Sequence, residues 1–154
     1  FTPFQWCPQD SMEEFRRKQQ LLKGALRGIK SADFHYHAPD LSVLEAVFSR
    51  GDRRLGPVLA DAFARGCRMD SWSEGFRPDL WQEAFAASRV DPDQYARRER
   101  ALAEPLPWDH LDMLVTKEYL AREYARALAG QTTQDCRQRC NGCFGEHDAR
   151  YCQV

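Results

Sequence analysis

The apolar residues of this chain recur mostly at intervals of three and four positions, the spacing that places them on one face of an amphipathic helix. Near the start of the chain, Ser11 and Glu14 have the spacing of a capping box, in which the two side chains satisfy free backbone N–H groups. The apolar residues that follow fall on one face before Gly28; they are Met12, Phe15, Leu22 and Leu26. The sequence therefore predicts a helix near residues 11–27.

The next helical pattern is interrupted by a glycine followed by an aspartate. Asp40 is placed to cap a helix that stops at Gly51, and Asp52 is placed to cap another that ends at Gly66. The apolar positions of these two helices are Leu41, Leu44, Val47 and Phe48 in the first, and Leu55, Val58, Leu59 and Phe63 in the second. We therefore expect two helices joined at a tight corner.

Three more helices are indicated in the second half of the chain. Pro78 suits the first turn of a helix whose apolar residues are Trp81, Ala84 and Phe85. A short helix through Tyr95 follows, and an extended proline-containing connector spans residues 103–107. Thr116 is placed to cap a last helix that Gly130 closes; its apolar residues are Leu120, Tyr124, Ala127 and Leu128.

Two short segments depart from the helical spacing. Residues 30–37 alternate between polar and apolar side chains, which is typical of a strand, and residues 67–72 have strand-like composition. Because two predicted helices lie between them, these strands would run parallel through a right-handed crossover. The predicted fold class is therefore mainly α with a small β element, a short parallel strand pair.

Composition narrows the class of protein. The chain has 154 residues, of which 43% are hydrophobic, enough to form a core. The formal net charge of −1 gives no basic field that indicates nucleic acid. No apolar run approaches the roughly 20 residues of a membrane helix. We therefore expect a soluble, cytoplasmic protein without a membrane partner, and nucleic acid is not indicated.

The most specific chemical signal is the spacing of four cysteines at the end of the chain. Cys136, Cys140 and Cys143 form a CxxxCxxC cluster, and Cys152 follows. The chain lacks the features of a small secreted disulfide framework, so thiolates this close together indicate a shared metal. Gly142 allows the backbone to turn so that neighbouring sulfurs point inward. Zinc and iron–sulfur clusters both accept such ligands, and the spacing alone does not choose between them.

The fourth ligand is open between Cys152 and His147, and an open coordination position is a third alternative. Positive side chains that would offset the charge of several thiolates are Arg137, Arg139 and Arg150. In the competing interpretation, the tail is disordered and its thiols bind nothing.

Three other groups of polar residues are weaker candidates for a functional site. His35 and His37 share one predicted strand face with Asp33, which permits a metal pair but more often marks a solvated face. The arginine-rich stretch at residues 50–54 is explained as a helix corner, although its guanidinium groups would also suit an anion. Residues 108–112 place an imidazole between two carboxylates, which fits acid–base work and capping equally well.

Several ordered motifs resemble the C-terminal part of radical S-adenosylmethionine proteins that carry an N-terminal cobalamin-binding-type domain. The stretches that carry the resemblance are Phe1-Thr2-Pro3-Phe4-Gln5-Trp6, Ser42-x-Leu44-Glu45-Ala46, Ser49-Arg50-Gly51-Asp52-Arg53-Arg54-Leu55, Gly66-Cys67-Arg68-Met69-Asp70-Ser71-Trp72-Ser73-Glu74, Pro105-Leu106-Pro107-Trp108-Asp109-His110-Leu111-Asp112 and the final CxxxCxxC. The resemblance covers nearly the whole chain up to the cysteine tail.

The resemblance implies a domain organisation. Residues 1–9 would be the last strand and linker of an upstream α/β barrel, residues 10–130 a mostly helical C-terminal extension, and residues 131–154 a metal-binding tail. The opening on Phe1 without an initiator methionine agrees with a piece of a longer protein. The parent protein would be an enzyme that reductively cleaves S-adenosylmethionine at a four-iron cluster, and the partner of this segment would be the barrel of the same chain.

The tail cysteines have the spacing of the catalytic cluster motif of this family, but their context differs. The family motif lies on the loop after the first barrel strand, usually with an aromatic residue before its last cysteine, where this chain has Gly142. A closed barrel also needs on the order of 200 residues. We therefore expect an auxiliary iron–sulfur cluster or a structural zinc site here, in a segment that is not itself catalytic. The alternative is a zinc-stapled interaction module without catalysis.

Overall fold

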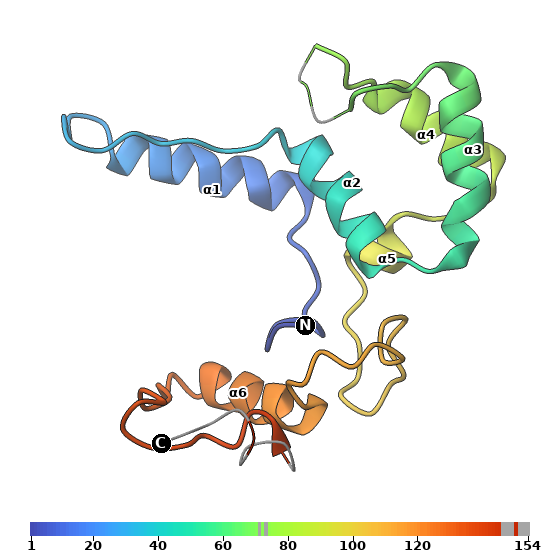
Figure 1. Cartoon of the computed structure of the whole chain (residues 1–154). Helices are drawn as coiled ribbons and strands as arrows, with labels where there is room; N and C mark the ends of the chain where they lie inside the picture. The colour runs from blue at the N-terminus through green and yellow to red at the C-terminus, as the bar shows by residue number, and fades with distance from the viewer. Residues whose placement is uncertain (71, 73, 146–149, 151–154) are drawn as a thin grey trace. The chain divides into compact units, whose positions relative to one another are not determined.

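The computed structural model describes residues 1–70, 72, 74–145 and 150, and these residues are mainly helical (Figure 1). The helices are α1 (Met12–Ala25), α2 (Pro39–Arg50), the 3₁₀ helix η1 (Arg53–Leu55), α3 (Gly56–Arg65), α4 (Pro78–Ala87), α5 (Asp93–Ala96) and α6 (Lys117–Leu128). The mainly α class predicted from the sequence is confirmed. None of the helices in this described part is long and apolar enough to cross a bilayer.

The predicted pair of parallel strands is not found in the described residues. Residues 32–38 are extended but have no strand partner, and they lead back from the end of α1 to α2 (Figure 1). Gln19 of α1 donates to the carbonyl of His37, and the rings of Phe34 and Tyr36 lie 5.0 Å apart between centroids. The alternating pattern therefore reflects side chains on two sides of an extended segment, whereas a strand also needs a neighbouring backbone.

The start of the second predicted strand, at residues 67 and 68, is bonded to the end of α3 and not to another strand. The guanidinium group of Arg68 lies 3.4 Å from the centroid of the Phe63 ring and donates to the carbonyls of Phe63 and Cys67. Met69 has a positive φ of 54°, which breaks the extended conformation. These local contacts satisfy the backbone near residue 67 without a sheet.

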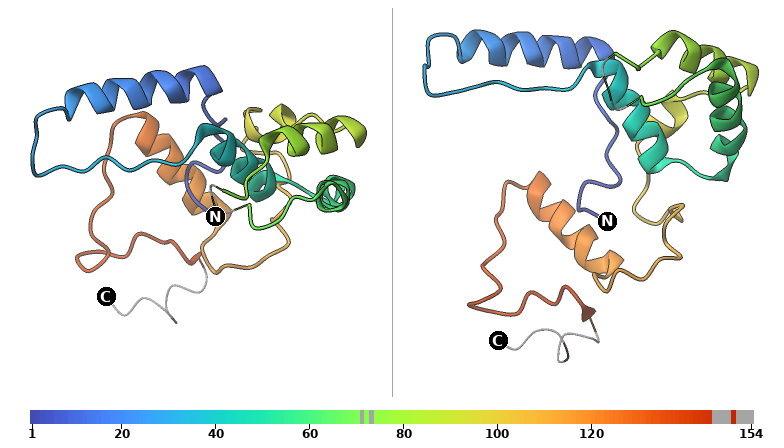
Figure 2. Two further views of the ribbon diagram at one scale, coloured as in Figure 1. Left: turned by 90° about the horizontal axis from the view of Figure 1, so that it is seen from above. Right: turned by 45° about the horizontal axis from the view of Figure 1, so that its top comes forward.

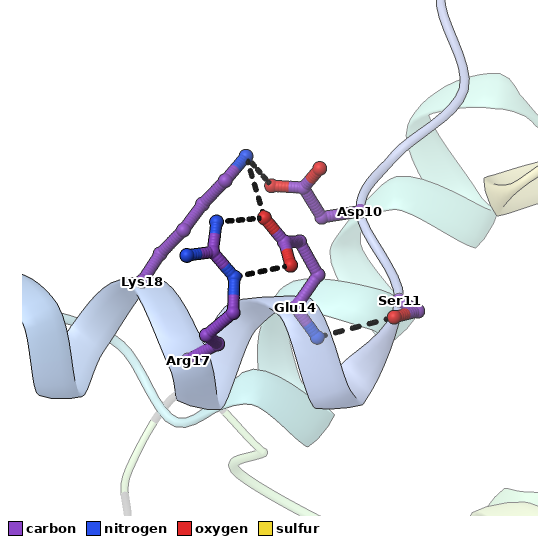
Figure 3. Close-up of polar contacts among 5 residues, drawn as sticks. All are labelled: Asp10, Ser11, Glu14, Arg17 and Lys18. Atoms are coloured by element: carbon purple, nitrogen blue, oxygen red, sulfur yellow. Dashed lines mark hydrogen bonds and ion pairs between the residues drawn. The ribbon is translucent and has the colours of Figure 1, made fainter.

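The start of α1 has the Ser11 cap that the sequence predicts, but the Glu14 side chain pairs with Arg17 and Lys18 in place of the backbone N–H that completes a capping box. The hydroxyl of Ser11 accepts from the backbone N–H of Glu14 at 3.1 Å, and Figure 3 shows the ion pairs grouped around Glu14. Arg17 lies 2.7 Å from Glu14, and Lys18 lies 2.6 Å from Asp10. The hydrogen bond from Arg17 lowers the pKa of Glu14 below its usual range. No residue of α1 is buried, so this helix depends on its cap and surface ion pairs more than the others do.

The chain divides into two compact units, and the larger one is Pro8–Arg98. Within this unit α3 packs beside α4 (Figure 2). An ion pair between Arg65 and Glu83 joins the two helices. Its core gathers one face from each of α2, α3, α4 and α5. The buried residues are Leu44, Val47, Leu55, Val58, Ala62, Cys67, Trp81, Ala84, Phe85, Tyr95 and Ala96.

The corner between α2 and α3 is built by Gly51 and Asp52. Asp52 caps η1 by accepting from the N–H of Arg54 at 2.9 Å, and Gly66 ends α3 in the left-handed region at φ 105°. Both features agree with the sequence. The prediction that Asp40 caps α2 is wrong, because the helix begins at Pro39, whose fixed φ suits a first position, and Asp40 lies inside the first turn.

The smaller unit joins Phe1–Cys7 to the residues from Glu99 onward. Its core is Trp6, Leu106 and Leu120, and Trp6 is 1% exposed. The N–H of Arg100 donates to the carbonyl of Trp6, and the indole of Trp108 donates to Gln5. Residues 3–6 form turns, so within the described residues the opening stretch is not a strand. Thr116 caps α6 as expected, and Gly130 follows with φ 67°.

Candidate metal centre

The three predicted ligands that the structure describes lie in the loop after α6, within residues 131–145. We call residues 135–143 the cysteine segment. Cys136 and Cys140 are exposed, Cys143 is half-buried, and all three are free thiols. The fourth predicted ligand, Cys152, and its alternative His147 lie outside the described residues.

Cys136 is presented by a turn that Asp135 nucleates. The carboxylate of Asp135 accepts from the backbone N–H of Arg137 at 2.9 Å, and the backbone carbonyl of Asp135 accepts from the N–H of Gln138 at 2.9 Å. Hydrogen bonds from the Arg137 side chain and backbone lower the pKa of Asp135. An aspartate at this position commonly forms such a turn with its own following backbone. The cysteine between them is therefore held at the surface.

Cys140 and Cys143 are separated by a glycine turn, as the sequence predicts. Gly142 has φ 70°, the left-handed region that favours glycine. Its backbone N–H points to the sulfur of Cys140 at 3.5 Å. Hydrogen bonds to cysteine sulfur are among the features that tune sulfur ligands in metal sites. The turn thus gives Cys140 one polar contact that a metal-bound thiolate would keep.

The end of the cysteine segment is tied to α6. The backbone N–H of Thr116 donates to the carbonyl of Cys143 at 2.9 Å, and Arg122 donates to the carbonyls of Asn141 and Gly142 at 3.3 and 3.5 Å. Burial raises the pKa of the nearby Tyr119, and the negative charge of Glu123 adds to that shift. Cys143 is therefore held at the cap of α6, and Arg122 of the same helix holds the two residues before it.

The described cysteines are not gathered into one coordination sphere. In the part of the chain that the structure describes, no three His, Cys, Asp or Glu side chains lie close enough together to hold an ion. The donor set itself fits a soft metal, because thiolates select zinc and iron–sulfur clusters. Metal binding commonly brings together ligands that are separate without it, so a loop with one anchored and two exposed thiols is compatible with such a site.

The arginines of the cysteine segment differ in their surroundings. Arg137 is paired with Asp135, and the hydrogen bond between them raises the pKa of its guanidinium group. The side chain of Arg139 makes no hydrogen bond or ion pair with any described residue. Of these two, Arg139 is therefore the one whose charge is not matched by a carboxylate of the described residues.

The two histidines proposed as a metal pair do not form one in the structure. His37 lies with its Nδ1 3.8 Å from Glu45, and both side chains are more than half exposed. Together with Asp33 and His35 they make no group suited to a metal among the described residues. This stretch is best described as a solvated face.

The arginine-rich corner is used structurally. Arg50 donates to the carbonyls of Tyr95 and Arg98, both at 2.8 Å, which joins α2 to the end of α5. Arg54 pairs with Asp52 at 2.6 Å. These contacts favour the helix-corner interpretation for the residues that take part in them.

The two carboxylates within residues 108–112, those of Asp109 and Asp112, accept hydrogen bonds from backbone N–H groups of neighbouring turns. Asp109 accepts from the N–H of Leu106 at 2.8 Å and pairs with Lys117 at 2.6 Å. Burial raises the pKa of Asp109, but the hydrogen bonds from Lys117 and Leu106 together lower it by more, so the net shift is downward. Asp112 accepts from the N–H of Leu114. These bonds favour the capping interpretation over acid–base chemistry.

Sequence reasoning missed the contribution of α6 to the cysteine segment. Arg122 contacts its backbone, and Arg126 lines a pocket beside it. Their spacing of four places them on one side of the helix, which is a signal that the sequence contains. Which loop that side faces depends on tertiary packing.

No protein-family model, no curated protein and no solved structure matches this chain.

Proposed function

We propose that this chain is the C-terminal segment of a radical S-adenosylmethionine iron–sulfur enzyme of the subgroup with an N-terminal cobalamin-binding-type domain. The support is the ordered set of motifs described above, through which the segment resembles that family over nearly its whole length. The helical fold agrees with an extension that lies outside a barrel. In this proposal the catalytic cluster and the S-adenosylmethionine site belong to an upstream barrel of the same parent chain.

The observation that carries a metal role for this segment is the arrangement of its three described cysteines. They are free thiols at spacings of four and three residues, the loop turns at Gly142, and the carbonyl of Cys143 is tethered to α6. Cys136, Cys140 and Cys143 would hold the metal, with Cys152 as the proposed fourth ligand. When bound, an iron–sulfur cluster supplies one-electron chemistry, whereas zinc supplies only a structural staple.

The residues around the thiols would support a bound group in two ways. The N–H of Gly142 would remain bonded to the sulfur of Cys140, and the positive charges of Arg137 and Arg139 would offset part of the thiolate charge. Thr116 and Arg122 would fix the end of the loop through backbone carbonyls. The segment itself provides ligands and position, and we assign it no catalytic residue.

The identity of the metal tests this proposal. We expect anaerobically purified protein to be brown, with broad visible absorbance and with iron and acid-labile sulfide in stoichiometric amounts. Colourless protein with one zinc per chain would instead support the zinc-stapled interaction module, the second candidate. Protein that takes up neither metal after reconstitution would contradict both.

The sequence of the parent gene tests the family assignment separately. The proposal predicts a second CxxxCxxC motif upstream, on a loop directly after a predicted strand. A parent gene that encodes no such motif would overturn the assignment to radical enzymes, whatever metal the tail binds.

A further inference from the structure

An open, polar pocket of about 510 Å³ lies between the C-terminal half of α6 and the cysteine segment. We call it the α6 pocket. Its lining residues are Arg126, Gln131, Thr132, Gln134, Arg139, Cys140 and Asn141. Two of these carry guanidinium groups, none carries a carboxylate, and the others are uncharged amide, hydroxyl or thiol side chains. A concave site with this lining favours an anion.

The guanidinium groups keep hydrogen-bond donors available. Nη1 of Arg126 donates to Glu123 at 3.0 Å and to Thr133 at 3.4 Å, while its Nε and Nη2 make no hydrogen bond with the described residues. The Arg139 side chain makes none with them at all. Guanidinium groups with unused N–H pairs are the side chains best suited to grip a carboxylate or a phosphate.

Each of the two described carboxylates near the pocket already has a partner. Glu123 is held by Arg126 and by the hydroxyl of Thr133, and Asp135 is paired with Arg137. Asn141 donates to the carbonyl of Gln134 at 2.9 Å, which fixes two sides of the wall to each other. The positive charge of Arg139 is therefore left without a partner among the described residues.

The C-terminus of α6 works against an anion, because the end of a helix carries about half a negative charge. Backbone groups already satisfy part of it: the N–H of Gln131 donates to the carbonyl of Arg126, and Ala129 and Gly130 cap further carbonyls. The charge of Arg126 is matched by Glu123, so the net positive charge of the lining comes from Arg139, which exceeds the partial charge of the helix end.

We propose that the α6 pocket binds a small oxyanion, a carboxylate or a phosphate group, between Arg126 and Arg139. The site requires no metal on the cysteines, although Cys140 borders it, so an anion bound there would lie beside the proposed metal ligand. The proposal is thus independent of the metal role assigned to the segment.

The test is a calorimetric titration of the whole chain, treated with a chelator and kept reduced, with inorganic phosphate and separately with succinate. We expect saturable binding of at least one of them. Arg139→Gln should weaken it by about tenfold or more, since hydrogen bonds to charged groups are the strong ones. Thr132→Glu, which places a carboxylate in the lining, should weaken it as well. The tighter of the two anions identifies the ligand as phosphate-bearing or carboxylate-bearing.

Arg137→Gln is the matched control, because Arg137 is in the same turn but pairs with Asp135 and does not line the pocket. Its titration should match that of the wild type. Absence of saturable binding by the wild type, or an equal loss in all three variants, would overturn the proposal. Circular dichroism of each variant confirms that the helices are retained. Because the protein is free of metal, neither result depends on whether the cysteines bind one.

Discussion

Glycine serves different purposes at the ends of two helices, Gly51 after α2 and Gly66 after α3. Gly66 has φ 105°, a conformation that side chains rarely adopt, and this is the reason sequence reasoning gives for a glycine at a helix end. Gly51 has an ordinary φ of −80°, so its conformation does not require glycine. What requires it is space: an added Cβ would lie 2.1 Å from a methyl carbon of Leu55 and 2.8 Å from the carbonyl oxygen of Val47.

Gly51→Ala should therefore lower the free energy of unfolding by about 2 kcal/mol, the cost of overpacking against the buried Leu55. Gly24→Ala is the matched control. Gly24 lies inside α1 and is followed by alanine, and a Cβ there meets nothing within 4 Å outside its own helix. This variant should be more stable by about 0.5 to 1 kcal/mol, because alanine restricts the unfolded chain. Urea denaturation of both variants measures the difference, and equal effects would contradict the steric account.

Asp52 is the carboxylate whose acidity the fold changes most clearly. The side-chain hydrogen bond from Arg54 is the main cause, and burial acts in the opposite direction; the net result lowers the pKa of Asp52 from 3.8 to about 2. The hydroxyl of Tyr95 also donates to it at 3.3 Å. The ionised form is therefore favoured in the folded protein.

A group with a lowered pKa in the folded state stabilises the protein above its unfolded pKa, and this contribution disappears as the pH falls to the folded value. Asp52→Asn keeps the helix cap but removes the charge. We expect it to cost about 1 kcal/mol above pH 4, discounted because Arg54 is largely exposed, and nothing near pH 2. Denaturation measured from pH 6 to 2 checks this, and a difference that does not change with pH would refute it.

Among the elements, α6 links the fold to the cysteine segment. Its cap, Thr116, accepts from the N–H of Tyr119 through its hydroxyl, and its own N–H donates to the carbonyl of Cys143. Thr116→Ala removes the first bond and should lower the free energy of unfolding by about 1 kcal/mol. Thr116→Ser retains the hydroxyl and should lie close to the wild type.

Amide hydrogen exchange locates the effect. In Thr116→Ala, the N–H of Tyr119 should exchange faster, while the N–H of Thr116 should keep its protection because its bond to Cys143 uses the backbone. Loss of protection at both amides would mean that the cap holds the cysteine loop as well.

The starts of three helices could be predicted from the sequence, because capping residues close to each start define them. Ser11, Asp52 and Thr116 cap the elements expected, because capping depends on residues three positions apart or fewer. The strands were not predictable in this way. The alternation at residues 30–37 is a local signal, but whether a partner backbone lies alongside is decided by distant parts of the chain.

At the scale of the whole molecule, the two cores show what the sequence pattern leaves open. Trp6, Leu106 and Leu120 lie far apart in the sequence and pack together, and no periodic pattern pairs them. The core of Pro8–Arg98 follows more directly from the apolar faces of its helices, since these are the positions that helical spacing identifies.

The candidate metal site was predictable in its donors but not in its geometry. The spacing of Cys136, Cys140 and Cys143 is visible in the sequence, and so is the turn at Gly142, because both are local. The anchoring of Cys143 by α6 and the available guanidinium of Arg139 depend on how the loop folds back on the helix. The position of Cys152 lies outside the described residues.

The measurement that tests the central claim most directly is the metal content of three matched proteins purified anaerobically: the wild type, Cys140→Ser and Cys7→Ser. Cys7 lies outside the cysteine segment, where its sulfur donates to the hydroxyl of Tyr124 at 3.5 Å, and serine keeps that donor. We predict that the wild type and Cys7→Ser bind the metal in equal amounts. Cys140→Ser should lose it while keeping its helical circular dichroism, since neither core contains a residue of the cysteine segment. Equal metal content in all three proteins, or none in any of them, would contradict the account.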